Sequence, residues 1–188
     1  METEMEFKQI ITEDEYVDCL RILNETSNFA EVFQINYYYD DKTFTLYNNG
    51  DTLRIRQTGD DLVFQSKVFL EMHNGIRFSA ESHQSIDRLP RSIIFNGCLY
   101  VYLGNLVTFR KTFNLKGVSV SFDKSQYLGV SDYEIEVETN DDATSTIPDA
   151  IYEMLLTKDN TISKYARFVN RLHEISNEKA IHINVPTI

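Results

Sequence analysis

Runs of residues in which apolar and polar side chains alternate recur along most of the chain, and this pattern constrains the fold most strongly. The strictest run is 132–139 (DYEIEVET), where Glu alternates with Tyr, Ile and Val. Because successive side chains of a β-strand point to opposite faces, such alternation predicts strands. Similar runs are found at 2–10, 34–41, 52–57, 62–68, 76–86, 106–115 and 118–123. The sequence therefore predicts about eight strands.

The connections between these runs indicate antiparallel pairing. A Gly-containing turn separates 52–57 from 62–68, and another separates 106–115 from 118–123, so each pair is predicted to form a hairpin. Helices do not alternate with the strands, as they would in a parallel sheet. We therefore expect an α+β fold in which the strands form a closed barrel or a sandwich.

Helices are predicted near both ends of the chain. Thr12 and Glu15 have the spacing of a capping box, which predicts a helix from there to about Glu25. Helical patterns also fall at 147–157 and 161–178. Short helices are expected near 43–48, before a stop signal at Asn49-Gly50, and near 90–97 within 88–104, a stretch that has no clear pattern.

A single domain, 1–188, is expected, because the sequence has no long linker and is long enough to bury a hydrophobic core. Its barrel strands are expected at about 2–139 and its C-terminal helices at about 147–178. The acidic N-terminus METEMEFK differs from a signal peptide, and Cys19 and Cys98 lack the spacing of metal ligands. We interpret both cysteines as reduced core thiols of a cytoplasmic protein.

The charge of the chain limits its partners. It has 18 Lys and Arg against 29 Asp and Glu, a formal net charge of −11. Nucleic-acid and membrane-surface binders usually carry a basic excess, so neither partner is expected, and no stretch approaches the ~20 apolar residues of a membrane span. A small anion is still possible, because Lys and Arg clustered in a cleft set the local potential. Both a monomer and a homodimer are compatible with the sequence.

Two predicted strands carry carboxylates on one face. Like charges at this spacing repel each other, and we expect crowding to raise the pKa values of Glu6, Glu134 and Glu136. A bound cation would relieve the repulsion, and carboxylate oxygens are the ligands that Mg²⁺ and Mn²⁺ prefer. The residues are Glu4 and Glu6 in the first strand and Glu134, Glu136 and Glu138 in the strand 132–139.

Basic residues occupy the faces of other strands. Arg54 and Arg56 share one face of 52–57, the next strand adds Lys67, and the run 106–115 adds Arg110. Arg binds phosphate oxygens through its forked guanidinium, and Lys binds them as a point charge. Cations of this kind beside a metal site are typical of phosphoryl transfer and phosphoanhydride hydrolysis.

Each of these patterns also has a simpler interpretation. Alternating Glu or Arg residues often form a solvated strand face or protect a strand edge from aggregation. By the same reasoning, Lys164 and Arg167 are expected on a solvated helix face, and Asp123 is expected at a strand end as a turn residue. The sequence has no Gly-rich phosphate loop, nucleophile elbow or zinc-type cluster.

Taken in order, the motifs resemble those of the CYTH family, which is named for class IV adenylate cyclase and thiamine triphosphatase. Glu4-x-Glu6-x-Lys8 resembles the family's N-terminal E-x-E-x-K signature, and the chain is most similar to members from Gram-positive bacteria. The matches continue to Phe168 in the order that the family shows. They are Arg54-x-Arg56, Lys67, Glu81, Arg110, Asp123, Glu134-x-Glu136-x-Glu138 and Ser163-Lys164-Tyr165-x-Arg167-Phe168.

The resemblance implies a closed eight-stranded antiparallel β-barrel, the triphosphate tunnel, with flanking helices. It implies that a triphosphate is bound by Lys8, Arg54, Arg56, Lys67, Arg110 and Lys164. It implies that Mg²⁺ or Mn²⁺ is held by Glu4, Glu6, Glu81, Asp123, Glu134, Glu136 and Glu138. Glu6, Lys67 and Glu136 are the expected catalytic residues. Lys111 follows Arg110 but belongs to the opposite strand face, so one cation of the family's usual set is expected to be missing.

The function that follows from the resemblance is metal-dependent hydrolysis of inorganic triphosphate, thiamine triphosphate or a nucleoside triphosphate. Two alternatives are open: a class IV-type adenylate cyclase, and a non-catalytic module that binds polyphosphate or a nucleotide. Cyclisation needs a pocket that folds the ribose 3′-hydroxyl onto the α-phosphorus, and no feature of the sequence specifies one. Hydrolysis needs only charge neutralisation and an oriented water.

Overall fold

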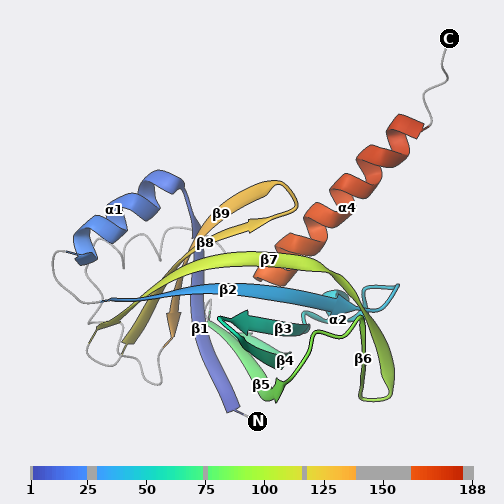
Figure 1. The fold of residues 1–188 in the computed structure, drawn as a ribbon. Coiled ribbons are helices and arrows are strands. Elements are labelled where there is room, and N and C mark those ends of the chain that lie inside the picture. The colour runs from blue at the N-terminus through green and yellow to red at the C-terminus, as the bar shows by residue number, and fades with distance from the viewer. Residues whose placement is uncertain (1, 25–28, 74–75, 116–117, 139–161, 184–188) are drawn as a thin grey trace.

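The computed structural model describes residues 2–24, 29–73, 76–115, 118–138 and 162–183. In this part of the chain, a nine-stranded antiparallel sheet curls into a half-barrel, with few helices beside it (Figure 1). The predicted class, antiparallel strands with flanking helices, is confirmed. The helix predicted at 147–157 lies outside the described residues. Among the helices that are described, none combines the length and the apolar character that a membrane span requires.

The structure fixes the bounds of the elements in chain order. The strands are β1 (Glu2–Ile11), β2 (Phe29–Asp40), β3 (Thr52–Thr58), β4 (Asp61–His73), β5 (Ile76–Ile86), β6 (Ser92–Phe95), β7 (Cys98–Leu115), β8 (Val118–Tyr127) and β9 (Val130–Glu138). The helices are α1 (Glu13–Asn24), α2 (Thr45–Asn49) and α4 (Lys164–Ile183). All the predicted strands are present, and β2, β4 and β7 are longer than the sequence suggested.

The sheet is open rather than closed. Its strands pair in the order β2-β3-β4-β5-β1-β9-β8-β7-β6, and β2 also pairs along β7, which links eight strands in a cycle with β6 at the edge. The weak point of this cycle is β1, whose residues 2–6 pair with β5 and whose residues 6–11 pair with β9. Within β1, Glu6 is the one residue that is paired on both sides. The two neighbouring strands, β5 and β9, therefore diverge along β1. The expectation that the barrel is closed is therefore wrong, and the sheet is a half-barrel.

The short helix expected near 90–97 is also wrong. This segment contains β6, which forms a hairpin with the start of β7 in the register Phe95↔Cys98. Asn96 and Gly97 make the turn with φ angles of 49° and 78°. An Asn-Gly pair with positive φ at both residues is the preferred two-residue hairpin turn, and this signal was present in the sequence.

One apolar core lies between α1 and the sheet. Cys19 and Leu23 of α1 pack with Phe122 of β8 and Ile135 of β9. The predicted capping box starts this helix: the Glu15 backbone N–H donates to Thr12 Oγ1 at 3.2 Å, and the Thr12 N–H donates to Glu15 Oε2 at 2.7 Å. Because neighbouring side chains of a strand alternate, the packing of α1 directs the residues next to Phe122 and Ile135 to the opposite face, where the site is.

A second core holds the start of α4 against the sheet. Tyr165 and Phe168 pack with Tyr38 of β2 and Leu106 of β7. Gly104 allows this approach, since a Cβ atom at that position would lie 2.7 Å from the Phe168 ring. From this contact α4 projects away from the sheet (Figure 1). The second core therefore fixes only the first turns of α4, and it fixes them beside β8 and β9.

The two cysteines differ in their surroundings. Cys19 is buried in the first core, where burial raises the pKa of its thiol to about 11. Cys98, at the start of β7, is exposed. The interpretation as core thiols is thus confirmed for Cys19 and wrong for Cys98.

Candidate active site

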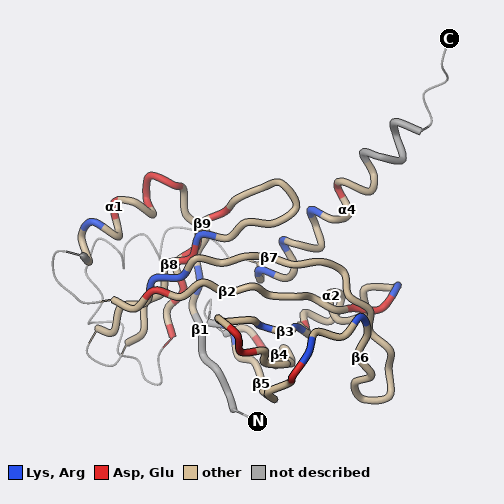
Figure 2. The backbone as a smooth tube through the Cα atoms, in the orientation of Figure 1, with Lys and Arg blue, Asp and Glu red and all other residues tan. Residues whose placement is uncertain are grey.

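A cavity of about 150 Å³ lies on the face of the sheet opposite α1, and we call it the basic cavity. Seven Lys and Arg side chains line it against three Glu, an excess of four positive charges in a chain of formal net charge −11. The charged lining residues are Lys8, Arg54, Arg56, Lys67, Arg77, Arg110 and Lys164, with Glu81, Glu136 and Glu138. The Lys and Arg positions along β3 and at the start of α4 are visible in Figure 2. The local potential is therefore opposite in sign to that of the whole chain.

Alternation along β3 explains why its two arginines reach the cavity. Leu53 and Ile55 are fully buried in the second core, so Arg54 and Arg56 point to the other face. On the neighbouring strand, the register pairs Arg54 with Gln65 of β4. The Arg-x-Arg motif is thus part of the cavity wall and not a solvated strand edge.

A hydrogen-bonded chain connects the cations of β3 and β4. Arg54 Nε donates to Gln65 Oε1 at 2.8 Å, and Gln65 Nε2 lies 2.9 Å from His83 Nδ1. His83 Nε2 is 3.4 Å from Glu81, which is ion-paired with Lys67 at 3.2 Å. Since Gln65 donates through its amide nitrogen, the His83 tautomer carries its proton on Nε2. Glu81, predicted as a metal ligand, contacts Lys67 and His83 and belongs to the cavity wall.

Arg56 lies in the cavity wall and is hydrogen-bonded to a neutral side chain. Its Nε donates to Asn36 Oδ1 at 3.0 Å, a neutral acceptor. Burial, with repulsion from Arg54 and Arg110, lowers the pKa of Arg56 to about 9. An anion in the cavity would relieve that repulsion, so the position favours a phosphate ligand.

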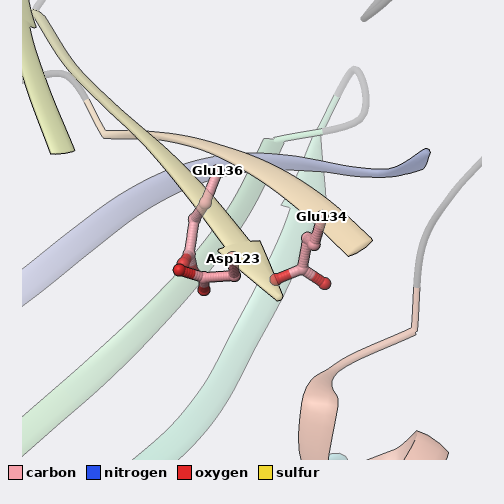
Figure 3. Close-up of side chains that lie close together, drawn as sticks. All are labelled: Asp123, Glu134 and Glu136. Carbon is pink, nitrogen blue, oxygen red and sulfur yellow. The ribbon is translucent and has the colours of Figure 1, made fainter. Parts of the chain in front are cut away.

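Three carboxylates meet at one side of the basic cavity, and we call them the acidic cluster: Asp123 of β8 with Glu134 and Glu136 of β9 (Figure 3). One oxygen from each lies within 4.8 Å of the others. Asp123 and Glu134 are 0% exposed and Glu136 is 6% exposed. Asp123, expected as a turn residue at a strand end, lies well inside β8. The expected solvated face of the Glu-x-Glu strand is therefore wrong for these residues.

Cations from α4 and β7 compensate the acidic cluster. Lys164 Nζ lies 2.8 Å from Asp123 and 3.5 Å from Glu136, and it also contacts Glu134. Arg110 binds Asp123 through two hydrogen bonds of 2.8 and 2.7 Å and also contacts Glu136. The side chain of Lys164 is only 9% exposed, so its assignment to a solvated helix face is wrong.

Arg167 and Lys8 complete this compensation. Arg167 NH1 donates to Glu134 at 2.7 Å, and its Nε donates to Asp132 at 2.9 Å. Lys8 Nζ lies 3.6 Å from Glu136 on the neighbouring strand. Arg167, like Lys164, is thus part of the site and does not belong to a solvated face.

The ion pairs set the protonation of the cluster. Burial is the largest single effect on Asp123 and Glu134, and it disfavours their charged forms. The attraction of Lys164, together with that of Arg110 at Asp123 and of Arg167 at Glu134, outweighs it, so both pKa values are lowered. The expectation that crowding raises carboxylate pKa values is therefore wrong for Glu134. The sequence could not show it, because the compensating cations come from distant segments.

The chemistry of the donors fits a hard divalent ion. Three carboxylates with converging oxygens are typical ligands of Mg²⁺ and Mn²⁺, and the buried acidic cluster could bind such an ion. In the backbone register, Glu6 of β1 is paired with Glu138 of β9, and Lys8 with Glu136.

The structure brings most of the predicted site residues together. All six predicted phosphate-binding cations line the basic cavity, as do Glu81, Glu136 and Glu138. Asp123 and Glu134 lie beside it in the acidic cluster. For Glu4 and Glu6 the structure gives the backbone pairing of β1, and their side chains lie outside the description. Lys111 is ion-paired with Glu31 at 2.8 Å and does not line the cavity, as its strand face predicted.

Arg77 is a cavity residue that the sequence analysis missed. It lies on β5 four residues before Glu81, so the period of the strand places both on one face. Its NH2 donates to the Gly50 carbonyl at 2.5 Å, and its guanidinium lies 4.6 Å from the centre of the Phe69 ring. The cation that Lys111 fails to supply is therefore replaced by one from β5.

Comparison with known proteins decides the family. The model of the CYTH domain matches residues 2–166. The chain belongs to the CYTH family. One CYTH relative, "Putative triphosphatase YjbK" of Bacillus subtilis (strain 168), is 30% identical over 153 residues, which cover 74% of this chain and 79% of that protein. The family resemblance that the motifs indicated is thus confirmed.

Solved structures share the fold of this CYTH chain. The crystal structure of a "putative adenylate cyclase" from Bacillus halodurans is 22% identical, with a TM-score of 0.68 and coverage of 89% of this chain and 99% of that one. "Putative adenylyl cyclase HpAC1" from Hippeastrum, said to have a dominant triphosphatase activity, is 18% identical, with a TM-score of 0.68 and coverage of 89% and 95%. At these identities the likeness shows the fold alone.

Proposed function

We propose that this CYTH chain is a metal-dependent hydrolase of a triphosphate: inorganic triphosphate, thiamine triphosphate or a nucleoside triphosphate. The observation that carries the proposal is a cavity with seven cations beside a buried cluster of three carboxylates. A triphosphate presents several anionic groups in a row, and a fixed row of Lys and Arg is suited to bind it. The name of the Bacillus subtilis relative supports the same reaction class.

The cations have two roles in this proposal. Lys8, Arg54 and Arg56 bind non-bridging phosphate oxygens, and an anion there would relieve the repulsion of Arg56 from Arg54 and Arg110. Lys67 binds the oxygen on which charge develops as the phosphoanhydride bond breaks, and this makes it a candidate catalytic residue. Arg110 and Lys164 interact both with the phosphate and with the acidic cluster.

The carboxylates hold the metal and orient the water. Glu136 is central because it lies in both the basic cavity and the acidic cluster. Glu4, Glu6 and Glu138 are proposed as further metal ligands, and the pairing of Glu6 in β1 with Glu138 in β9 supports this for those two. A bound Mg²⁺ or Mn²⁺ would supply Lewis-acid stabilisation of charge on the phosphate oxygens. Glu6 and Glu136 would orient the attacking water by accepting its hydrogen bonds.

One incubation tests the proposal against its alternatives. The protein is mixed with inorganic triphosphate, thiamine triphosphate or ATP, with Mg²⁺ or Mn²⁺, and the products are separated. Release of phosphate or pyrophosphate that requires the metal is the expected result. Cyclic AMP from ATP would identify a cyclase, and binding without any product would identify a non-catalytic module. Either outcome would overturn the proposed hydrolase.

A further inference from the structure

Tyr38 of β2 is a fully buried residue whose hydroxyl group has no hydrogen-bond partner. Its two neighbours on β2 behave differently. The Tyr37 hydroxyl donates to Gln57 Oε1 at 2.8 Å, and the Tyr39 hydroxyl donates to the Pro90 carbonyl at 2.7 Å. The absent partner thus distinguishes Tyr38 from the tyrosines on either side of it, although Asn36 Nδ2 on the same strand also lacks a partner.

The position of Tyr38 indicates where a partner would be. Of the described residues that line the basic cavity, Tyr38 is the one with a buried side-chain oxygen or nitrogen that lacks a partner. Buried polar groups are almost always hydrogen-bonded, and an exception calls for an explanation such as a ligand. Phe at this position would keep the ring packing without the cost of an unpaired hydroxyl. The hydroxyl therefore has a use that the ligand-free structure does not show.

The surroundings of Tyr38 restrict the chemistry of that partner. Tyr38 is paired with Arg54 across the sheet and lines the cavity together with Arg54, Arg56 and Lys164. The charged groups that act on it are Arg54, Lys164, Arg56 and Arg167, and all four are donors without an acceptor atom. The tyrosine ring cannot turn away easily, because it packs on Tyr165 and Phe168 at centroid distances of 5.0 and 5.3 Å. The hydroxyl is thus held among cations and needs an acceptor that is brought from outside. An anionic oxygen fits both requirements.

We propose that the Tyr38 hydroxyl donates a hydrogen bond to a non-bridging phosphate oxygen of the triphosphate bound in the basic cavity. The inference rests on the proposed function and deepens it, since it adds a neutral donor to a set of cations. Because Tyr38 is near Arg54 and Lys164, the phosphate that it binds is the one at the α4 end of the cavity. Tyr38 would donate a hydrogen bond to an oxygen there without adding a charge to the cavity.

The test is Tyr38→Phe, which removes only the hydroxyl oxygen. Affinity for inorganic triphosphate is measured by isothermal titration calorimetry with EDTA, so that hydrolysis does not interfere. A hydrogen bond to a charged acceptor predicts a dissociation constant at least about tenfold higher in the variant. The melting temperature without ligand should be unchanged or higher, because an unpaired buried hydroxyl has been removed.

Tyr39→Phe is the matched control, since it removes a hydroxyl that has a partner from the next residue. It should lower the melting temperature and leave the triphosphate affinity unchanged. Equal affinity of Tyr38→Phe and wild type would overturn the role of Tyr38 while leaving the proposed function intact. A Tyr38→Phe protein that melts well below the wild type, or fails to fold, would make the hydroxyl structural and also overturn it. A wild type that binds triphosphate neither in EDTA nor with Mg²⁺ would remove the proposed function and this inference together.

Discussion

The ammonium group of Lys164, in the first turn of α4, lies 2.8 Å from Oδ2 of Asp123 on β8. It also contacts Glu134 and Glu136, so one side chain from the C-terminal helix contacts all three carboxylates of the acidic cluster. A divalent ion in this cluster would share the same carboxylates with Lys164. We therefore expect the docking of α4 and metal binding to be linked through Lys164.

Lys164→Met should destabilise the metal-free protein by about 3–5 kcal/mol, because removal of one partner leaves buried carboxylates uncompensated. Mn²⁺ should restore part of the loss by supplying positive charge to the cluster. Denaturation by urea with and without Mn²⁺ measures both effects. Lys111→Met is the control: its ion pair with Glu31 lies on the other strand face and is half-exposed, so less than about 1 kcal/mol should be lost. A Lys164→Met protein as stable as the control would show that the cluster does not depend on Lys164.

The lowered pKa values of Asp123 and Glu134 predict how stability depends on pH. A carboxylate whose pKa is lower in the folded than in the unfolded protein stabilises the fold above its unfolded pKa, near ~4, and that contribution is lost as the pH falls towards the folded pKa. The free energy of unfolding should thus be nearly constant around neutral pH and fall in acid. In Lys164→Met the fall should begin at higher pH, since the main cause of the lowered pKa values is gone. Urea titrations at a series of pH values test this, and a wild type that becomes more stable in acid would contradict it.

Arg56→Met should separate binding from stability. The pKa of Arg56, about 9, reflects burial and repulsion from Arg54 and Arg110, so its removal should leave the melting temperature without ligand unchanged or raised. The rise in melting temperature on addition of triphosphate should become small or vanish. Thermal melts of both proteins with and without triphosphate provide the measurement. Arg21→Met, which changes an exposed residue of α1, should keep the wild-type rise. If Arg56→Met melts much lower but keeps that rise, Arg56 is a structural residue.

Triphosphate should stabilise the wild type far more than monophosphate does. A ligand that binds only the folded state adds about 2.7 kcal/mol at ~100 times its dissociation constant. Several phosphates can contact Lys8, Arg54, Arg56 and Lys67 together, whereas a single phosphate reaches only some of them. Melting temperatures are compared at equal ligand and metal concentrations. Equal stabilisation by the two ligands would mean that the cavity binds one phosphate group and not a row.

The face of the strand on which each site residue lies could be predicted, because side chains alternate strictly between the two faces of a strand. Once Leu53 and Ile55 are buried, Arg54 and Arg56 must share the other face, and the same holds for Glu134 and Glu136 beside Ile135. Arg77 follows the same rule relative to Glu81 and could have been found in this way. Alternation along a strand was therefore enough to predict the face of a residue wherever the buried neighbours on the same strand determine it.

What the sequence could not show depends on contacts between distant segments. From their spacing alone, Lys164 and Arg167 indicate a solvated helix face, because the sequence of α4 does not show which of its faces contacts β9. The lowered pKa values at Asp123 and Glu134 follow from the same contacts. The open half-barrel depends on the register of β1, which pairs its two halves with different strands, and alternation carries no information about register.

Glu136→Gln gives the most direct test of metal-dependent hydrolysis, because Glu136 alone belongs to both the basic cavity and the acidic cluster. The substitution keeps the shape of the side chain and removes one charge. Phosphate release from inorganic triphosphate is measured for wild type and variant across one titration with Mg²⁺ and one with Mn²⁺. We predict that the wild type needs the metal and that the variant loses most of its turnover and responds more weakly to metal, while triphosphate still binds. A variant with wild-type turnover and an unchanged metal requirement would contradict the assignment of the site.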